Sequence, residues 1–416
     1  MIILHTSDWH LGHSLCGKRR HEEFRAFLSW LLDAMRRERV DALLLSGDIF
    51  DSALPGNAAQ SLYYDFLRQA TLPSGPCRHV VIIAGNHDSP SFLDAPGTLL
   101  SSMHIHVIGK AREPENETLL LRDPNGQPEL IVCAVPFLRD RDLYRAGDGD
   151  DMDDRDRRML EGMREHYRRA ALEAERLRKG LDLPVLAMGH LFAAGGMTGG
   201  DDGVRDLRVG SLGQVDADVF PATFAYVALG HLHRAQKVHG EERIRYSGSP
   251  LPMGFDEAGL PREVRLLSTE GSRVLSRGLS VPSFQRLERV EGNIDAVERR
   301  LDELAASGES VWAEVVHTGQ DRVADLRERV EARVQGGLEV LRIRNVRSLT
   351  EGMNADPEEE HLEELSVEEV FERRLRDAFP ESDPDDPKLA ILRATFRESV
   401  AAALRDDDEE DHACAF

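Results

Sequence analysis

Carboxylate, amide and imidazole side chains follow five separate apolar segments of the chain, and groups of these types could hold metal ions. Asp8 and His10 come just after the apolar segment 2–6, and Asp48 comes just after 42–46. In an extended segment, residues i and i+2 point to the same side, so Asp8 and His10 can both reach one ion. The candidates that follow the other three segments are Asn86, His87, His190, His231 and His233.

Each of these residues also has an ordinary structural alternative. An Asp after a strand commonly closes a turn, an Asn beside Gly is a frequent turn former, and a single His is often a turn residue or a satisfied core group. The joint pattern favours a metal site instead, because five strand ends each offer an Asp, Asn or His. Gly47, Gly85 and Gly230 directly precede three of these groups. A coincidence of this kind is improbable.

The types of ligand indicate the class of ion. Asp, Asn and His without thiolates suit a borderline or hard divalent ion such as manganese, iron or zinc. Seven ligands drawn from these candidates are too many for one ion, but they fit two ions about 3.5–4 Å apart with one bridging carboxylate. Such a pair can activate water and stabilise the charge on a phosphoryl group.

These groups need a sheet whose strand ends meet at one edge, and the first 275 or so residues have the corresponding pattern. Short apolar runs alternate with polar loops and with stretches that have apolar residues at helical spacing. The predicted strands are 2–6, 42–46, 79–84, 130–135, 185–189 and 225–230, and the predicted helices are 21–39, 57–70 and 156–179. This alternation predicts a layered α/β domain over residues 1–278. Ligand sites in such domains lie beyond the carboxyl ends of the strands.

After residue 278 the pattern of apolar and polar segments changes. A second, smaller α/β unit is predicted over 279–349, and a polar, acidic linker is predicted over 350–364. Two amphipathic helices are then expected within 365–405, before an acidic tail at 406–416. Two helices cannot form a core of their own, so they must pack on the preceding unit or dock on a partner.

The composition limits the possible partners and locations. The chain has 52 Lys and Arg against 75 Asp and Glu, which gives a net charge of −23. This balance argues against nucleic acid, which usually needs a basic surface, but two divalent cations at the predicted site could still bind phosphate.

The apolar runs are far shorter than the roughly 20 residues of a membrane span. The four cysteines are scattered without a CxxC spacing, so a cytosolic location is expected.

The motifs carry a resemblance to a known family. Asp8-x-His10, Gly47-Asp48-x-x-Asp51, Gly85-Asn86-His87-Asp88, His190 and Gly230-His231-x-His233 resemble the five motifs of the calcineurin-like metallophosphoesterase superfamily. The strings HTSDWHLG, SGDIFD and YSGSPLPMGF resemble the SbcD family of bacterial nucleases within it. The resemblance implies a four-layer α/β sandwich with a smaller α/β capping domain, which helps to bind DNA, and C-terminal helices.

The resemblance also implies a role for each site residue. Three ligands would hold one ion and three would hold the other. The first set is Asp8, His10 and His233, and the second is Asn86, His190 and His231. Asp48 would bridge the ions, while His87 would contact the scissile phosphate and help the leaving oxygen depart. Asp51 would orient His87, or it is only a cap or turn residue. Asp88 is expected to be a structural turn residue.

The implied activity is that of a manganese-dependent DNA nuclease in repair and recombination. Enzymes of this family degrade double-stranded ends as exonucleases and open single strands or hairpins as endonucleases. The resemblance further implies a homodimer within a heterotetramer with SbcC, a coiled-coil ATPase on which the C-terminal helices would dock, and a nucleoid-associated location. Two rival functions are a phosphatase or small-molecule phosphodiesterase on the same site, and a non-catalytic scaffold. The finer strings argue against the first rival, and the complete ligand set argues against the second.

Overall fold

Two six-stranded sheets form the framework that carries the predicted ligands. The computed structural model describes residues 1–72, 74–143, 152–193, 215–319 and 325–345, which fall within one compact unit. The first sheet has the order β14 (Arg273–Val281), β13 (Arg262–Glu270), β1 (Ile2–Thr6), β4 (Ala42–Ser46), β5 (His79–Ile83) and β6 (Ile105–Ile108). Its last four strands are parallel, whereas β13 and β14 add an antiparallel hairpin at one edge.

The second sheet repeats this plan. Its order is β11 (Gln236–Val238), β12 (Glu241–Tyr246), β10 (Tyr226–Gly230), β9 (Val185–His190), β8 (Pro128–Ala134) and β7 (Thr118–Arg122). The four inner strands are parallel, and each outer strand pairs antiparallel with its neighbour. Each sheet therefore presents the carboxyl ends of several parallel strands at one edge, where polar loops can meet.

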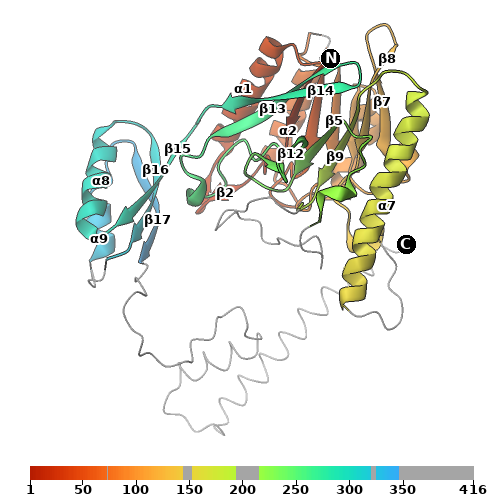
Figure 1. Cartoon of the computed structure of the whole chain (residues 1–416). Helices are drawn as coiled ribbons and strands as arrows, with labels where there is room; N and C mark the ends of the chain where they lie inside the picture. Colours follow the sequence, from red (N-terminus) through yellow and green to blue (C-terminus); the bar gives the residue numbers. More distant parts are fainter. Residues whose placement is uncertain (73, 144–151, 194–214, 320–324, 346–416) are drawn as a thin grey trace, which may run out of the picture. The chain divides into compact units, whose positions relative to one another are not determined.

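The sheets pack face to face between two layers of helices. Helices α1 (His21–Glu38) and α2 (Asn57–Thr71) cover the outer face of the first sheet, and α7 (Met152–Arg178) covers that of the second (Figure 1). Between the sheets, Leu44 and Val81 belong to the same apolar cluster as Val132 and Met188. Strands buried on both faces read as continuous apolar runs, which is why β4 has the sequence ALLLS. The four-layer α/β sandwich predicted above is confirmed.

A smaller α/β unit follows the first two sheets. Its parallel strands β15 (Arg286–Gly292), β16 (Val311–His317) and β17 (Leu338–Asn345) are covered on one face by α8 (Ile294–Ala306) and α9 (Leu326–Glu331). Asn293 caps α8 by accepting a hydrogen bond from Ala296 N (3.0 Å). An apolar seam of four buried residues joins this unit to the larger one. The seam consists of Leu15, Phe255, Leu287 and Trp312.

The remaining elements are short. They are β2 (Ser14–Leu15), β3 (Lys18–Arg19), α3 (Pro90–Asp94), α4 (Gly97–Ser101), α5 (Pro114–Glu117), α6 (Asp140–Leu143) and the 3₁₀ turns η1 (Ala217–Val219) and η2 (Phe255–Glu257). Within the described ranges, the helices are too short or too polar to cross a membrane. The predicted linker 350–364, the helices within 365–405 and the tail 406–416 lie outside the described residues.

The interface between the two sheets predicts a large cost for a cavity there. Leu44 is fully buried at this interface, so Leu44→Ala should lower the free energy of unfolding by about 2–5 kcal/mol. Leu275→Ala is the control, because Leu275 is 61% exposed and its truncation should cost less than about 0.5 kcal/mol. Urea unfolding of the metal-free proteins measures both values. Equal costs for the two variants would contradict the four-layer packing.

Candidate metal centre

The predicted ligands lie at the carboxyl ends of five parallel strands. The strands and their residues are β1 with Asp8 and His10, β4 with Asp48, β5 with Asn86 and His87, β9 with His190, and β10 with His231 and His233. Backbone hydrogen bonds tie the first two loops together, because Asp8 N donates to Gly47 O (3.0 Å) and His10 N donates to Asp48 O (3.0 Å). The position of one loop therefore fixes the position of the other.

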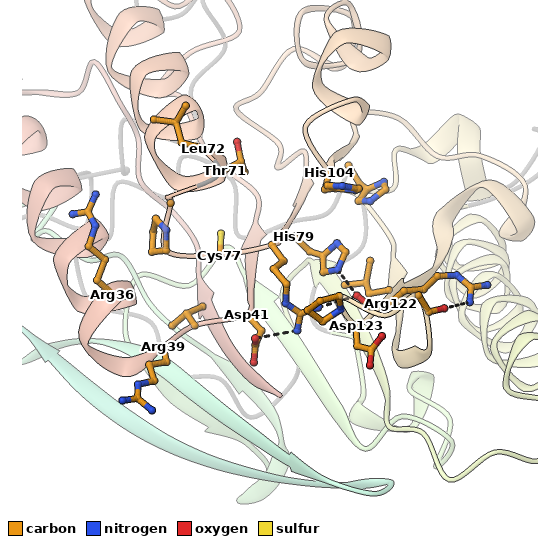
Figure 2. Close-up of a pocket in the computed structure, with 18 of the residues that line it drawn as sticks. Arg36, Arg39, Asp41, Thr71, Leu72, Cys77, His79, His104, Arg122 and Asp123 are labelled. Atoms are coloured by element: carbon orange, nitrogen blue, oxygen red, sulfur yellow. Dashed lines mark hydrogen bonds and ion pairs between the residues drawn. The ribbon is translucent and has the colours of Figure 1, made fainter.

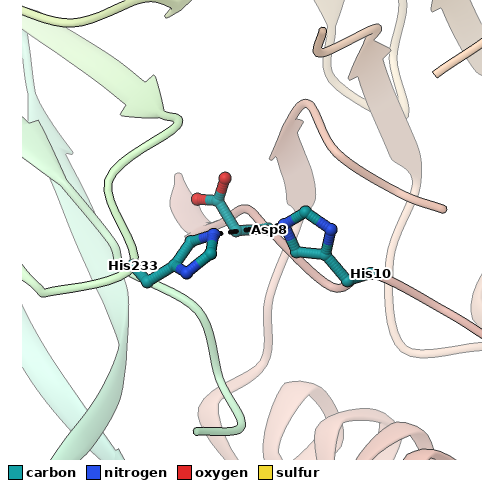
Figure 3. A group of neighbouring side chains, drawn as sticks. All are labelled: Asp8, His10 and His233. Atoms are coloured by element: carbon teal, nitrogen blue, oxygen red, sulfur yellow. Dashed lines mark hydrogen bonds between the residues drawn. The ribbon is translucent and has the colours of Figure 1, made fainter. Parts of the chain in front are cut away.

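One group of ligands combines the loop after β1 with the loop after β10. Ligand atoms of Asp8, His10 and His233 all lie within 4.8 Å of one another (Figure 3). The Nε2 atoms of His10 and His233 are 3.2 Å apart, and the three side chains are buried. Two imidazole nitrogens and a carboxylate thus converge on one point from two different sheets.

A second group lies beside the first. His190 Nε2 is 2.9 Å from Asn86 Oδ1, and His231 Nδ1 is 3.2 Å from the same oxygen. Asp48 lies between the groups, because its Oδ2 atom is 3.6 Å from His10 Nε2 and 3.3 Å from His190 Nε2. All seven predicted ligands are therefore brought together, with one carboxylate between two sets of three.

The backbone at the centre is held in unusual conformations. Asp8, His10, Asp48 and His231 all have positive φ angles, of 53°, 45°, 49° and 103°. Non-glycine residues adopt this region at a cost of order 1–3 kcal/mol each, and such residues gather at functional sites. Close approach also explains Gly85, because a Cβ atom there would collide with the Asp48 carboxylate.

Burial controls the charge of these groups. It raises the pKa of the Asp8 carboxyl to about 7 and lowers the pKa of His10 to about 4 and of His231 to about 3. Burial alone would lower the pKa of His190, but the nearby Asp48 carboxylate raises it to about 9. His190 in turn holds the pKa of Asp48 well below its usual range, against the effect of burial. Most of the imidazoles are thus held neutral, which is the form that binds metal.

The donor set fits a pair of divalent cations. Oxygen and imidazole nitrogen donors without thiolates suit manganese, iron or zinc. Nε2 of His231 is buried and has no hydrogen-bond partner among the described residues, although buried polar atoms are nearly always satisfied. Asp8 and Asp48 are at most 2% exposed, and buried carboxylates need a compensating charge. Cations placed between the two groups would supply the charge that these carboxylates need.

His87 sits at the edge of the centre and is only partly buried. Its backbone N donates to Asp48 Oδ1 (3.0 Å), and its Nδ1 is 3.1 Å from the backbone carbonyl oxygen of Asp51. The Asp51 carboxylate instead bonds to Nδ1 of His13 (2.9 Å) and lies 3.7 Å from Nδ1 of His10. Asp51 therefore contacts His87 through its main chain, whereas its side chain faces two other histidines.

Asp88 contributes more than a local turn. Its buried carboxylate accepts hydrogen bonds from the backbone N of Gly85 (2.8 Å), Ile49 (3.2 Å) and Phe50 (3.0 Å). These bonds hold the loop after β5 against the loop after β4. The sequence pattern indicated only a turn residue at Asp88, because contacts between distant segments leave no local pattern.

Two serines outside the predicted ligand set also support the centre. Ser7 Oγ donates to the Asp8 carboxylate and lies 2.8 Å from Ser247 Oγ. Ser247 belongs to the string YSGSPLPMGF, which was noted only for its resemblance. In the sequence, the position of Ser7 directly before the predicted ligand Asp8 was the one feature that could have indicated this supporting role.

A large cavity lies away from the candidate metal centre (Figure 2). The predicted ligands do not line it, although its volume is about 950 Å³. Arg78 is paired there with Asp41 (3.0 Å) and Glu129 (2.9 Å). Both α1 and α2 end at this cavity, after which Arg39 and Leu72 follow. Arg36 and Arg39 lie at the end of α1, where guanidinium groups complement the negative end of the helix dipole.

The bonds made by Asp88 predict its contribution to stability. Asp88→Ala leaves three buried N–H groups without an acceptor, so it should lower the free energy of unfolding by about 2–5 kcal/mol. Asp123 also accepts backbone hydrogen bonds, from Asn125 and Gln127, but in an exposed turn. Asp123→Ala should therefore cost less than about 1 kcal/mol. Urea unfolding without metal tests the pair, and an equal loss in both variants would refute the role of Asp88.

Comparisons with known proteins agree with this geometry. A family model described as calcineurin-like phosphoesterase matches residues 1–235, and one described as type 5 capsule protein repressor C-terminal domain matches residues 283–379. The chain is 35% identical over 379 residues to the SbcD component of the nuclease SbcCD from Escherichia coli K12, which covers 90% of this chain and 92% of that protein. The protein of the same name from Bacillus subtilis is 31% identical over 94% of this chain and 97% of its own length.

A third relative shows higher identity over a shorter stretch. The SbcD component of the nuclease SbcCD from Rhodobacter capsulatus is 39% identical over 65% of this chain and 67% of its own length. Nearly full-length similarity to the first two relatives, the family match over the sandwich and the gathered ligands point to one assignment. The chain belongs to the calcineurin-like phosphoesterase family and, within it, to the SbcD family.

Proposed function

We propose that the chain is the two-metal, manganese-dependent component of a DNA nuclease and that it hydrolyses phosphodiester bonds. The observation that carries the proposal is the position of Asp48 Oδ2 between His10 Nε2 (3.6 Å) and His190 Nε2 (3.3 Å), which belong to the two ligand sets. The names of the relatives, which are components of the nuclease SbcCD, support DNA as the substrate. The action is exonucleolytic on double-stranded ends and endonucleolytic on single strands and hairpins.

The chain's own residues have distinct tasks in this reaction. Asp8, His10 and His233 would hold one ion, and Asn86, His190 and His231 would hold the other, with Asp48 between them. When bound, the two ions would polarise the phosphodiester and lower the pKa of water, so that hydroxide can act as the nucleophile. The buried ligands exclude other solvent from this point, which strengthens the electrostatic interactions there.

His87 is placed to assist the leaving oxygen. A carbonyl oxygen only accepts, so the contact with the Asp51 main chain requires the proton of His87 to sit on Nδ1. Nε2 then faces away from Asp51, and in the imidazolium form it can donate a proton to the departing oxygen. Asp51 thus sets the orientation of His87, and we assign it this supporting role rather than a direct part in the chemistry.

The proposed partners follow from the family. We place SbcC, a coiled-coil ATPase, as the partner in a heterotetramer that contains two copies of this chain. The match of the second family model to residues 283–379 supports a shared C-terminal region. DNA substrates place the protein at the nucleoid in the cytoplasm. Phosphate groups would meet a local cationic centre despite the overall charge of −23.

A pair of substitutions tests the two-metal assignment. His87→Ala should lower manganese-dependent cleavage of hairpin DNA by about 100-fold or more, while the metal content stays near two ions per chain. Asp48→Ala should instead lower the binding of both ions, because it removes the shared carboxylate. Metal analysis and cleavage assays are run on the same preparations.

His21→Ala provides the control for these two variants, because His21 lies at the start of α1, outside the centre. It should keep both the metal and the activity. Loss of both ions from the His87 variant would refute its role as a non-ligand. An intact two-ion site in the Asp48 variant would refute the bridge.

A truncation tests the proposed partner surface. Deletion of residues 357–416 should remove co-purification with SbcC, because the predicted docking helices lie in that segment. Manganese-dependent cleavage of single-stranded DNA should remain, because every proposed ligand precedes the deletion. Co-purification of the truncated chain with SbcC would contradict the docking proposal and would leave the metal assignment unaffected.

A further inference from the structure

Metal binding would impose a definite protonation pattern on His10 and His233. Their Nε2 atoms lie 3.2 Å apart and converge with the Asp8 carboxylate (Figure 3). To bind one ion together, both Nε2 atoms must present lone pairs. A neutral imidazole carries a single N–H, so the proton of each ring must then sit on Nδ1. Each buried Nδ1–H group consequently needs a hydrogen-bond acceptor.

For His190 the structure places a hydrogen-bond acceptor behind the ring, and for His10 it places a carboxylate just beyond hydrogen-bond distance. His190 Nδ1 is 2.9 Å from the backbone oxygen of Ser46, which only accepts. His10 Nδ1 is 3.7 Å from Asp51 Oδ1. His233 Nδ1, in contrast, is buried without a hydrogen-bond partner among the described residues. A carboxylate oxygen, Oε1 of Glu257, lies 3.9 Å from it.

Glu257 is built firmly into the structure at this position. It is 4% exposed, and its Oε2 atom accepts from Met253 N (2.6 Å) and from Arg262 Nη2 (2.6 Å). The same guanidinium donates through Nη1 to the backbone oxygen of His233 (2.8 Å). Arg262 therefore holds both the main chain of His233 and the carboxylate of Glu257, which lies near the ring.

We propose that Glu257 is a positioning residue that accepts a hydrogen bond from Nδ1 of His233 and so directs Nε2 toward the ion shared with Asp8 and His10. The proposal rests on the two-metal function proposed above. Ligating histidines commonly donate their second ring N–H to a carboxylate, which fixes the ring orientation and raises its basicity. The separation of 3.9 Å exceeds a hydrogen-bond distance, so the proposal requires the ring and the carboxylate to approach each other as the ion binds.

The alternative is that Glu257 only anchors the loop through its ion pair with Arg262. The chain contains a matched pair that does only this. Glu23 is buried and accepts from Arg20 Nε (2.7 Å) and Nη2 (2.9 Å). Arg20 Nη1 donates to Pro252 O (2.7 Å), so this pair anchors the segment just before Met253, to which Glu257 bonds, and does not contact a proposed ligand.

The test compares Glu257→Ala with Glu23→Ala in the full-length chain, with manganese ion alone as the probe. Calorimetric titration measures the affinity of each ion, and urea unfolding without metal measures stability. Glu257→Ala should weaken one of the two ions by about 10–100-fold and leave the other unchanged. Glu23→Ala should keep both affinities despite a comparable loss of stability. Glu257→Gln keeps an acceptor oxygen, so it should recover part of the affinity, and it carries the test if the Ala variant does not fold.

A double-mutant cycle separates positioning from general loosening. In a His233→Ala background, Glu257→Ala should have no further effect on manganese affinity, because its target ring is absent. An undiminished effect in that background, or equal effects of the Glu257 and Glu23 variants, would overturn the proposal. A wild-type chain that binds fewer than two ions would overturn the two-metal function as well, and the wild-type titration alone reveals that outcome.

Discussion

The cost of burying carboxylates is the constraint on which the rest of the site depends. Asp8 and Asp48 lie in the interior at the junction of two sheets, where an uncompensated charge is expensive by several kcal/mol. The fold offers partial compensation: His231 N and Ser7 Oγ donate to Asp8, and His87 N donates to Asp48. Left-handed backbone at four ligands shows that the surrounding structure holds these groups together against local preference. Cations would complete this balance, so the groups that lie in strained backbone are also the candidate metal ligands.

The candidate ligands come from two sheets, so the relative position of the sheets has to be fixed. Most of the interface is apolar and non-directional, but a set of hydrogen bonds crosses it beside the metal centre. His5 Nε2 is 3.2 Å from Leu229 O, and Ser46 Oγ donates to Ala228 O (3.0 Å). His190 Nδ1 adds a bond to Ser46 O (2.9 Å). These directional contacts set the alignment of the strands that carry ligands, which apolar packing alone does not specify.

The sequence predicts the core strands well because they are buried on both faces. The predicted strands 2–6 and 42–46 coincide with β1 and β4, and each begins with an apolar run, of three residues in β1 and four in β4. The hairpin β13–β14 was not predicted, because β14 is largely exposed and carries no such run. The gathering of the candidate ligands was predictable because these residues follow strands at short, regular spacing. The role of Asp88 and the proximity of Glu257 to His233 were not, because they depend on contacts between distant segments. The contact between His87 and the main chain of Asp51 was not predictable either, because a sequence motif specifies side chains and this contact does not involve the Asp51 side chain.

The apolar seam joins the smaller unit to two segments that lie near the candidate metal centre. Leu15 lies in the hairpin that follows His10, and Phe255 lies in the same 3₁₀ turn as Glu257. Both pack against Leu287 and Trp312 of the smaller unit, and Lys18 forms an ion pair with Glu339 (2.5 Å). The smaller unit therefore has two attachments to the larger one. The short connection from β14 to β15 joins it to the edge of the first sheet, and the apolar seam joins it to segments that adjoin His10 and Glu257, beside the candidate metal centre.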